Sequence, residues 1–418
     1  MNFDRMRALL LERAIRGELV PQLTEDGSIE QVGNGSGLFD IPKSWGWFEF
    51  SKVVKTLSSR GNQIPAKEIC ERGRFPVVTQ SKNSLIDGYS EEESKLVPKA
   101  FLPLLVFGDH TRFLKYVDFQ FIVGADGTKL IRPKDDGFVN CSYLYYVLRA
   151  LVPETKDRGY SRHFQFLKKL MIPVPPIHEQ CRIVDRVEEL LSEINRAEKA
   201  YEELQTLAGV LRGQILQEAI QGKLVPQMAE EGVVEQIGVA PDERPFEIPK
   251  SWKWRALDEI FKFVDYRGKT PTKTTDGVRL ITASNVRQGY VDHKRIEFIS
   301  SEEYIDRQNR GISKKGDILF TTEAPLGNVA LADLDVYSAG QRVITLQTDS
   351  ENKKLLMYFM LSPYFQKALK NNATGTTAQG IKAARLKKLM LPVPPVEEQA
   401  RIASKVEELL KQVDALSA

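Results

Sequence analysis

The sequence predicts an α+β protein with two similar globular domains of mixed helices and strands. A long antiparallel coiled coil separates them, in a circular pseudo-two-fold arrangement. Three observations lead to this prediction: a heptad pattern in the middle of the chain, an internal repeat, and the circular order of the repeated parts. The 418 residues are enough for two to three domains, and a hydrophobic content of 42% is that of a chain with a buried core.

The stretch from Ile183 to Ile215 carries apolar residues at steps that alternate between four and three. A period of 3.5 residues places one apolar seam along a helix and predicts a partner helix in a coiled coil. An amphipathic helix that lies on a globular core is the alternative. The seam positions are Ile183, Val187, Leu190, Ile194, Ala197, Tyr201, Leu204, Ala208, Leu211 and Ile215.

The chain contains an internal repeat, which is the first feature to seek in a long sequence. LERAIRGELVPQ at Leu11 to Gln22 recurs as LQEAIQGKLVPQ at Leu216 to Gln227. FDIPKSWGW recurs as FEIPKSWKW, and LKKLMIPVPPIHEQCRI recurs as LKKLMLPVPPVEEQARI. Three matches in the same order indicate a duplication.

The repeat is circular, because the first copy opens with the last part of the helical unit and the second copy closes with its first part. The C-terminal helix continues the seam pattern at Ile402, Val406, Leu409, Val413 and Leu416. We therefore expect the two termini, laid end to end, to pair with the central helix, and a homodimeric coil is the alternative. The predicted parts are 1–36 (N-terminal helix), 37–176 (first domain), 177–243 (central region with the long helix), 244–395 (second domain) and 396–418 (C-terminal helix).

The two globular segments share a frame but differ in their loops. In each, a buried strand ends in a polar loop, FGDHTR in one copy and FTTEAPLGN in the other. Helices are predicted at Ser142 to Ala150 and at Lys353 to Leu369. One frame with different loop tips is what two readers of different DNA sequences would have, and neutral drift after duplication is the alternative.

Loop side chains of Arg, Lys, Asn, Gln, Ser and Thr suit groove readout, because Arg and Lys pair with guanine, and Asn and Gln with adenine. Each candidate could instead contact phosphate or be a solvated surface residue. The DNA-binding candidates are Arg60, Asn62, Gln80, Lys82, Asn83, His110 and Arg112 in the first domain, and Arg267, Lys269, Thr270, Ser284, Asn285, Arg287, Thr376, Thr377 and Gln379 in the second.

Catalytic and metal motifs fail on inspection. The four His and three Cys stand at no metal-ligand spacing. SPYF at Ser362 to Phe365 differs from the adenine-methyltransferase tetrad at Tyr364, and GKT at Gly268 lacks the Walker glycine. We therefore expect no catalytic site and no metal site. The charged N-terminal sequence and scattered Cys indicate a reduced cytoplasmic protein, and a net charge of +3 provides no polybasic tail.

The doubled LKKL..PVPP..EQ.RI stretch followed by VEELL, with its circular order and two variable domains, resembles the specificity (S) subunit of type I restriction–modification systems. FGDHTR is also similar to a segment of target-recognition domains in that family. The resemblance implies a DNA-specificity subunit that reads a bipartite double-stranded target through two target-recognition domains. It implies two modification (methyltransferase) subunits and restriction subunits as partners, with S-adenosylmethionine, ATP and Mg on those partners and no cofactor on this chain. The alternatives are a self-contained DNA methyltransferase or nuclease, and a DNA-independent coiled-coil scaffold.

Overall fold

The computed structural model describes residues 1–30, 37–124, 127–152, 162–235, 245–266, 270–375 and 379–417. The chain divides into two compact units, Met1–Tyr201 and Glu202–Ala418. Each unit contains one copy of the repeat, with mixed helices and strands, as the sequence predicts.

The first unit is built on an antiparallel sheet in the order β2-β9-β6-β7. Its inner strand β6 is buried along its whole length and pairs with β9 (Leu105 with Ile131) and β7 (Leu105 with Tyr116). A second sheet has the order β3-β8-β4-β5, and β1 pairs with β10. The strands are β1 (Gly46–Glu49), β2 (Val54–Leu57), β3 (Gln63–Ile64), β4 (Phe75–Val78), β5 (Gly88–Ser90), β6 (Leu104–Gly108), β7 (Leu114–Val117), β8 (Ile122–Gly124), β9 (Thr128–Pro133) and β10 (Met171–Val174).

The second unit repeats this plan with the sheet β12-β19-β16-β17, and with β11 paired to β20. Its small sheet differs from that of the first unit. Both keep a parallel pair (β4 with β8, β14 with β18) and an antiparallel neighbour (β5, β15), but β3 joins β8 whereas β13 joins β15. The strands are β11 (Lys253–Ala256), β12 (Lys262–Asp265), β13 (Lys273–Thr274), β14 (Val278–Ile281), β15 (Phe298–Ile299), β16 (Ile318–Thr322), β17 (Leu326–Leu331), β18 (Ser338–Ala339), β19 (Val343–Gln347) and β20 (Met390–Val393).

Helix ends follow local capping chemistry. Asn140 and Asn352 cap α3 and α8 by accepting the N–H of Tyr143 and Leu355. The single helix predicted at Lys353 to Leu369 is instead two helices, because Ser362 caps a new helix with Pro363 in its first turn. The helices are α1 (Phe3–Ile15), α2 (Phe50–Val53), α3 (Cys141–Leu151), α4 (Phe164–Leu167), α5 (Ile177–Ile220), α6 (Leu257–Ile260), α7 (Ser301–Arg307), α8 (Lys353–Leu361), α9 (Pro363–Asn372), α10 (Ala383–Leu386) and α11 (Val396–Ser417).

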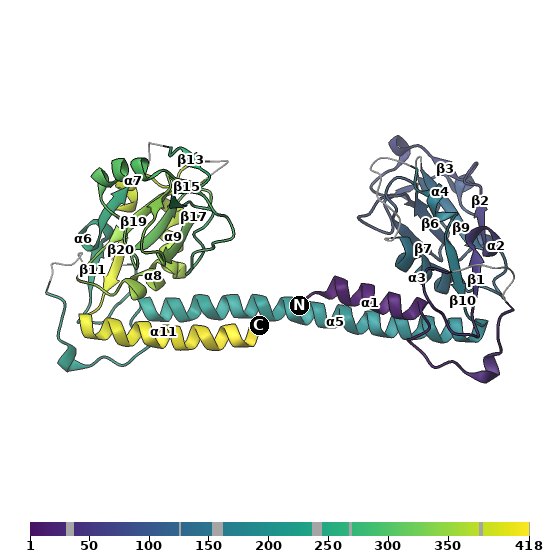
Figure 1. The fold of residues 1–418 in the computed structure, drawn as a ribbon, viewed down its shortest axis with the longest axis horizontal. Coiled ribbons are helices and arrows are strands. Elements are labelled where there is room, and N and C mark those ends of the chain that lie inside the picture. Colours follow the sequence, from purple (N-terminus) through teal and green to yellow (C-terminus); the bar gives the residue numbers. More distant parts are fainter. Residues whose placement is uncertain are drawn as a thin grey trace. The chain divides into compact units, whose positions relative to one another are not determined.

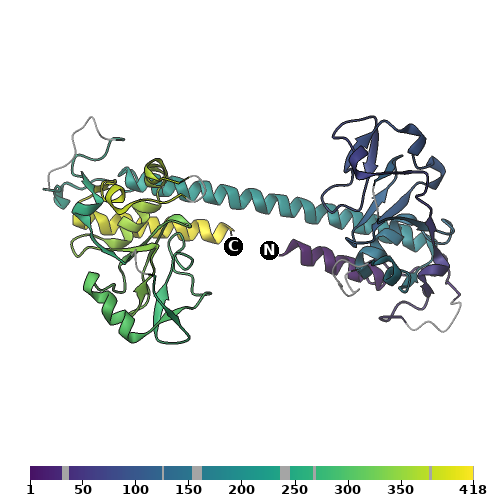
Figure 2. The ribbon, with the colours of Figure 1, turned by 90° about the horizontal axis from the view of Figure 1, so that it is seen from above.

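The central helix α5 spans 44 residues and contributes to both units. In the first unit α1 runs antiparallel along it, because Phe3 meets Tyr201, Arg7 pairs with Glu198 and Gln22 donates to Glu179. Figures 1 and 2 both show α1 beside this half of α5. Most seam residues of this half are buried (Ile183, Val187) or half-buried (Leu190, Ile194, Tyr201), but the predicted seam residue Ala197 is exposed.

In the second unit α11 runs antiparallel along the other half of α5 (Figures 1 and 2), with Gln205 donating to the Ser417 carbonyl and Arg212 paired to Asp414. The α11 seam residues Ile402, Val406 and Val413 are buried, Leu409 is half-buried, and Ile215 is buried on α5.

Besides Ala197, three seam predictions are wrong in part, because Leu204 is 38% exposed, Leu211 is 41% exposed and Leu416 of α11 is 66% exposed. Leu204 lies beyond Gln205, the residue that meets the last described turn of α11. Leu211 lies at the edge of the buried face of α5. In the following turns this face is made by residues such as Leu216 and Ile220, which belong to the core of the second domain.

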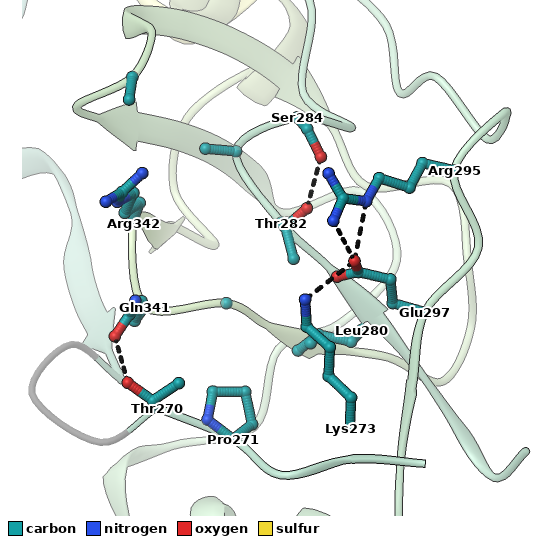
Figure 3. A pocket seen from close by; sticks show the side chains of 13 residues that line it. Thr270, Pro271, Lys273, Leu280, Thr282, Ser284, Arg295, Glu297, Gln341 and Arg342 are labelled. Carbon is teal, nitrogen blue, oxygen red and sulfur yellow. Dashed lines mark hydrogen bonds and ion pairs between the residues drawn. The ribbon is translucent and has the colours of Figure 1, made fainter. Parts of the chain in front are cut away.

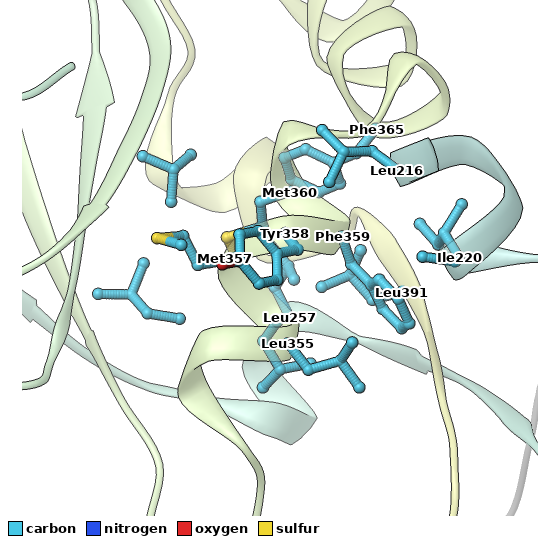
Figure 4. Packing of buried hydrophobic residues seen from close by; sticks show 14 of the residues in the cluster. Leu216, Ile220, Leu257, Leu355, Met357, Tyr358, Phe359, Met360, Phe365 and Leu391 are labelled. Carbon is cyan, nitrogen blue, oxygen red and sulfur yellow. The ribbon is translucent and has the colours of Figure 1, made fainter. Parts of the chain in front are cut away.

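That core surrounds α8, whose Leu355 and Phe359 are fully buried. Figure 4 shows Leu216 and Ile220 of α5 reaching the same cluster as Leu391 of β20. The long helix is therefore part of the domain core in this unit.

The polar letters of the repeated EQ.R motif have the same contacts in both units. Glu179 accepts from Gln22, and Glu398 accepts from Gln227. Arg182 pairs with Asp26 as Arg401 pairs with Glu231. The repeated motif thus forms the same junction twice. It holds the segment after α1 against the start of α5, and the segment after α5 against the start of α11.

Candidate nucleic-acid interface

The β6–β7 hairpin of the first domain ends in the FGDHTR loop, which is fixed from below by Asp109. The buried Asp109 carboxylate accepts the Phe164 N–H at 2.7 Å, and its carbonyl accepts the His163 N–H at 2.8 Å. At the tip, Arg112 has a φ of 58°, an uncommon conformation for a residue other than glycine. Arg112 therefore lies in a tight turn whose backbone is fixed by the hydrogen bonds of Asp109.

Two sequence candidates in this domain have structural roles. Gln80 accepts the His110 N–H at 3.1 Å through Oε1 and the Thr111 hydroxyl at 2.7 Å through its carbonyl, so it holds the hairpin tip. The Asn62 amide donates to the Leu96 carbonyl at 2.6 Å. We correct the prediction for Asn62, whose amide is used inside the domain. Gln80 holds the hairpin tip through its oxygens, and its contact with DNA stays a prediction. Arg60 is exposed and lies outside the pocket described next.

Three other candidates are brought together around one pocket of about 590 Å³: Lys82, Asn83 and Arg112. Its far wall is made by residues that sequence reasoning missed, namely Tyr116 of β7 and Tyr145 and Arg149 of α3. Their signal was weak, because a Tyr and an Arg four residues apart on a helix look like ordinary surface positions.

The second domain has a pocket of about 410 Å³ over its small sheet (Figure 3). The sequence candidates Thr270 and Ser284 line it, with Thr270 donating to the Gln341 side chain at 2.7 Å. Lys273, Arg295, Glu297 and Arg342 line it as well and were missed. A period-two signal existed for Arg295 and Glu297, since residues two apart along an extended segment point to the same side.

Glu297 organises the cations of this pocket, which we name the second-domain pocket. Its Oε1 accepts from Lys273 Nζ at 2.9 Å and from Arg295 Nε at 2.8 Å, as drawn in Figure 3. Burial raises the pKa of this carboxyl, but the hydrogen bonds and charges of Lys273 and Arg295 outweigh burial, and the net pKa is lowered. The carboxylate stays ionised near neutral pH, and two cations against one anion leave the site positive.

The remaining candidates do not assemble into one site. Asn285 is 0% exposed, accepts the Thr282 N–H at 3.0 Å and donates to the Asp292 and Arg295 carbonyls, so its predicted DNA contact is corrected to a structural role. Arg287 pairs with Asp292, and Gln379 is exposed. Arg267, Lys269, Thr376 and Thr377 lie outside the described residues.

Within the described ranges, His, Cys, Asp and Glu form no group that could hold a metal ion. None of the helices described is long and apolar enough to cross a bilayer. The three cysteines, Cys70, Cys141 and Cys181, are free thiols.

Each of the two α+β repeats thus carries a pocket lined by polar and cationic side chains. The family model for the type I restriction modification DNA specificity domain matches this chain twice, at residues 42–205 and 249–417. The chain therefore belongs to the family of type I restriction–modification specificity subunits. Such subunits are non-catalytic, and the catalytic activities lie in other subunits.

Relatives match over most of their length. The chain is 22% identical to the EcoAI specificity subunit of Escherichia coli, covering 99% of this chain and 90% of that protein. It is 24% identical to the MjaVIII specificity subunit of Methanocaldococcus jannaschii, covering 90% and 87%.

Two solved structures share the fold. The first comes from work on complex assembly and conformational transition of the type I restriction–modification system, with a TM-score of 0.65, 18% identity and coverage of 91% of this chain and 93% of that one. The second is the HsdS subunit of Thermoanaerobacter tengcongensis, with a TM-score of 0.52, 18% identity and coverage of 91% and 92%.

Proposed function

We propose that this specificity subunit reads a bipartite double-stranded DNA target, one half-site with each domain. The observation that carries the proposal is the pair of non-equivalent pockets. Lys82, Arg112 and Arg149 line one, whereas Lys273, Arg295 and Arg342 line the other. Cations at these positions suit phosphate contacts that set register, and different loop residues on one scaffold suit different bases.

We further propose that the domains at 37–176 and 244–395 are the target-recognition domains, joined by an antiparallel coiled coil in a circular pseudo-two-fold arrangement. The circular repeat and the antiparallel contacts of α1 and α11 with α5 support this. A 44-residue helix at 1.5 Å per residue measures roughly 65 Å. Its length would then determine how many base pairs between the half-sites are not read.

The partners under this proposal are two modification subunits and, through them, restriction subunits. S-adenosylmethionine, ATP and Mg would be bound by those subunits. Polar and charged residues on α5, such as Glu188, Arg196 and Lys199, lie outside the seam and are exposed, which makes this surface a candidate docking face.

Methylome sequencing tests the proposal. A host that expresses this chain with its modification subunits should acquire adenine methylation at one motif of two specified parts separated by a fixed gap. The same host without this chain should not. Methylation by the purified chain alone would instead favour a self-contained methyltransferase. A motif that is unchanged by omission of the chain would favour a scaffold without a DNA role.

A further inference from the structure

The pocket of the first domain, which we name the first-domain pocket, has a buried ion pair at its floor. Lys115 on β7 is 3% exposed and binds Asp87 Oδ2 at 2.7 Å. Asp87 also accepts the Thr79 N–H at 2.7 Å and the Ser84 hydroxyl at 3.2 Å. Burial raises the pKa of Asp87, but the Lys115 and Thr79 hydrogen bonds outweigh it and lower the pKa overall. The 84–87 loop is therefore anchored at the pocket floor.

The walls combine aromatic rings with cations. Tyr116 and Tyr145 come from different elements, β7 and α3, with ring centroids 5.9 Å apart. The Arg149 guanidinium lies 5.4 Å from the centre of the Tyr145 ring. Lys82 and Arg112 stand at the rim, and none of the described lining residues is acidic. Aromatic rings stack with bases, and nearby cations hold phosphates.

The second domain has the same scaffold but lacks the aromatic rings and cations at the corresponding positions. The β6–β7 and β16–β17 hairpins can be aligned on the segments FGDHTR and FTTEAP, whose Phe107 and Phe320 occupy the same position. Leu105, paired with Tyr116, then corresponds to Ile318, paired with Leu331. The N-caps Asn140 and Asn352 align α3 with α8. On this alignment Lys115, Tyr116, Tyr145 and Arg149 correspond to Ala330, Leu331, Met357 and Leu361.

A loop covers the region of the second domain that corresponds to the first-domain pocket. The Gly289 N–H donates to the Val329 carbonyl at 2.8 Å, and the Asn328 side chain donates to the Val286 carbonyl at 2.8 Å. A loop thus lies on β17 where the first domain has an open pocket. The shared scaffold does not require Tyr116, Tyr145 or Arg149, because the second copy has apolar residues in their places.

We propose that the first-domain pocket receives one base unstacked from the bound DNA, with the base against Tyr116 and Tyr145 and its phosphate near Arg112 and Lys82. The volume of about 590 Å³ is ample for one nucleotide. The second domain has no equivalent pocket, so we expect no base to be extruded into that domain. This inference rests on the proposed function and names the form of DNA that the first domain holds.

The test uses the full chain, prepared with its modification subunits, and duplexes that carry its target. An abasic site is placed opposite each base of the first half-site in turn, so that the base is already unpaired. At one position other than the methylated adenine, which the modification subunits themselves extrude, the wild-type protein should bind about tenfold more tightly than to the intact duplex, because unpairing normally costs a few kcal/mol.

The matched variant carries the residues of the second domain, Tyr145→Met with Arg149→Leu. It should bind the intact duplex about tenfold more weakly, as expected for loss of base stacking, and should lose the gain at the abasic position. Lys52→Met, an exposed charge on α2, should keep both. An equal loss on intact and abasic duplexes would reduce the pocket to a phosphate contact and overturn the proposal. Absence of a gain at every position would overturn it too. Equal binding of target and scrambled duplexes by the wild type would instead contradict the proposed function.

Discussion

Gln399 accepts, through Oε1, a hydrogen bond of 2.7 Å from the backbone N–H of Asn352, the N-cap of α8. Gln180 makes the same bond, at 2.8 Å, to Asn140 at the start of α3. Both glutamines are 0% exposed and also donate to proline carbonyls, Pro394 and Pro175. One buried glutamine per repeat therefore joins the start of a long helix to the cap of a domain helix.

Gln399→Leu should destabilise the second unit, because the leucine fills the same space but leaves the Asn352 N–H and the Pro394 carbonyl without partners. Each buried group left unsatisfied costs about 1–3 kcal/mol, so the two together cost about 2–6 kcal/mol. Urea unfolding measures the change. Gln412→Leu, at an exposed position of α11, is the control and should change the unfolding free energy little. Equal effects of the two substitutions would refute the role of Gln399.

Acid should weaken the junctions of the two repeats through their carboxylates. The hydrogen bond and charge of Arg401 lower the pKa of Glu231 below its ordinary value of 4.5, as Arg182 does for Asp26. A carboxyl with a lowered pKa stabilises the fold above its unfolded pKa, and this stabilisation is lost as pH falls through the folded value.

Arg401→Met should therefore lower stability at pH 7 and flatten its decline below about pH 4.5. Urea unfolding at a series of pH values checks this, with Lys388→Met, an exposed cation of the same unit, as the control. An unchanged pH profile in Arg401→Met would show that the pair contributes nothing.

The cations of the second-domain pocket should contribute phosphate contacts. Arg295→Met should weaken binding to all sequences alike and reduce the slope of log K against log salt by about 0.9. Glu297 keeps Lys273 as a partner in this variant, so the pocket floor is retained. Titrations at several salt concentrations measure the slope. A loss confined to one base position, with an unchanged slope, would make Arg295 a base reader instead.

The length of the central helix should set the gap in the target. One heptad inserted after Tyr201 adds about 10 Å, which is close to three base pairs at 3.4 Å each. The methylated motif should keep its half-site bases and gain about three unread base pairs. An insertion of three residues at the same place rotates the helix faces and should impair assembly. A lengthened helix with the original gap would rule out the ruler mechanism.

The sequence predicts much of the scaffold, because periodicity and duplication are properties of the backbone plan. Heptad steps locate α5, and the repeated EQ.R letters coincide with residues whose contacts also repeat. The same pattern fails at Leu204 and Leu211, where the extent of α11 and the domain core decide burial. Periodicity carries no information on where a partner helix ends.

The site is predicted less well than the scaffold. Residue type alone favours Asn285 and Gln80 as amides that read adenine, yet both are used for hydrogen bonds inside the domain. Conversely, Tyr145 and Lys273 reach their pockets only through long-range packing of a helix or an edge strand. Such convergence depends on tertiary structure, so one sequence does not reveal it.

The central claim, that each domain reads one half of a bipartite target, is tested most directly by a domain exchange. The segment from Phe246 to Pro395 is replaced by the corresponding segment of a relative with a known target, and the methylome of the host is sequenced. The account predicts a motif in which one half changes to that of the relative while the other half and the gap stay the same. A motif with both halves altered, or with neither altered, would contradict it.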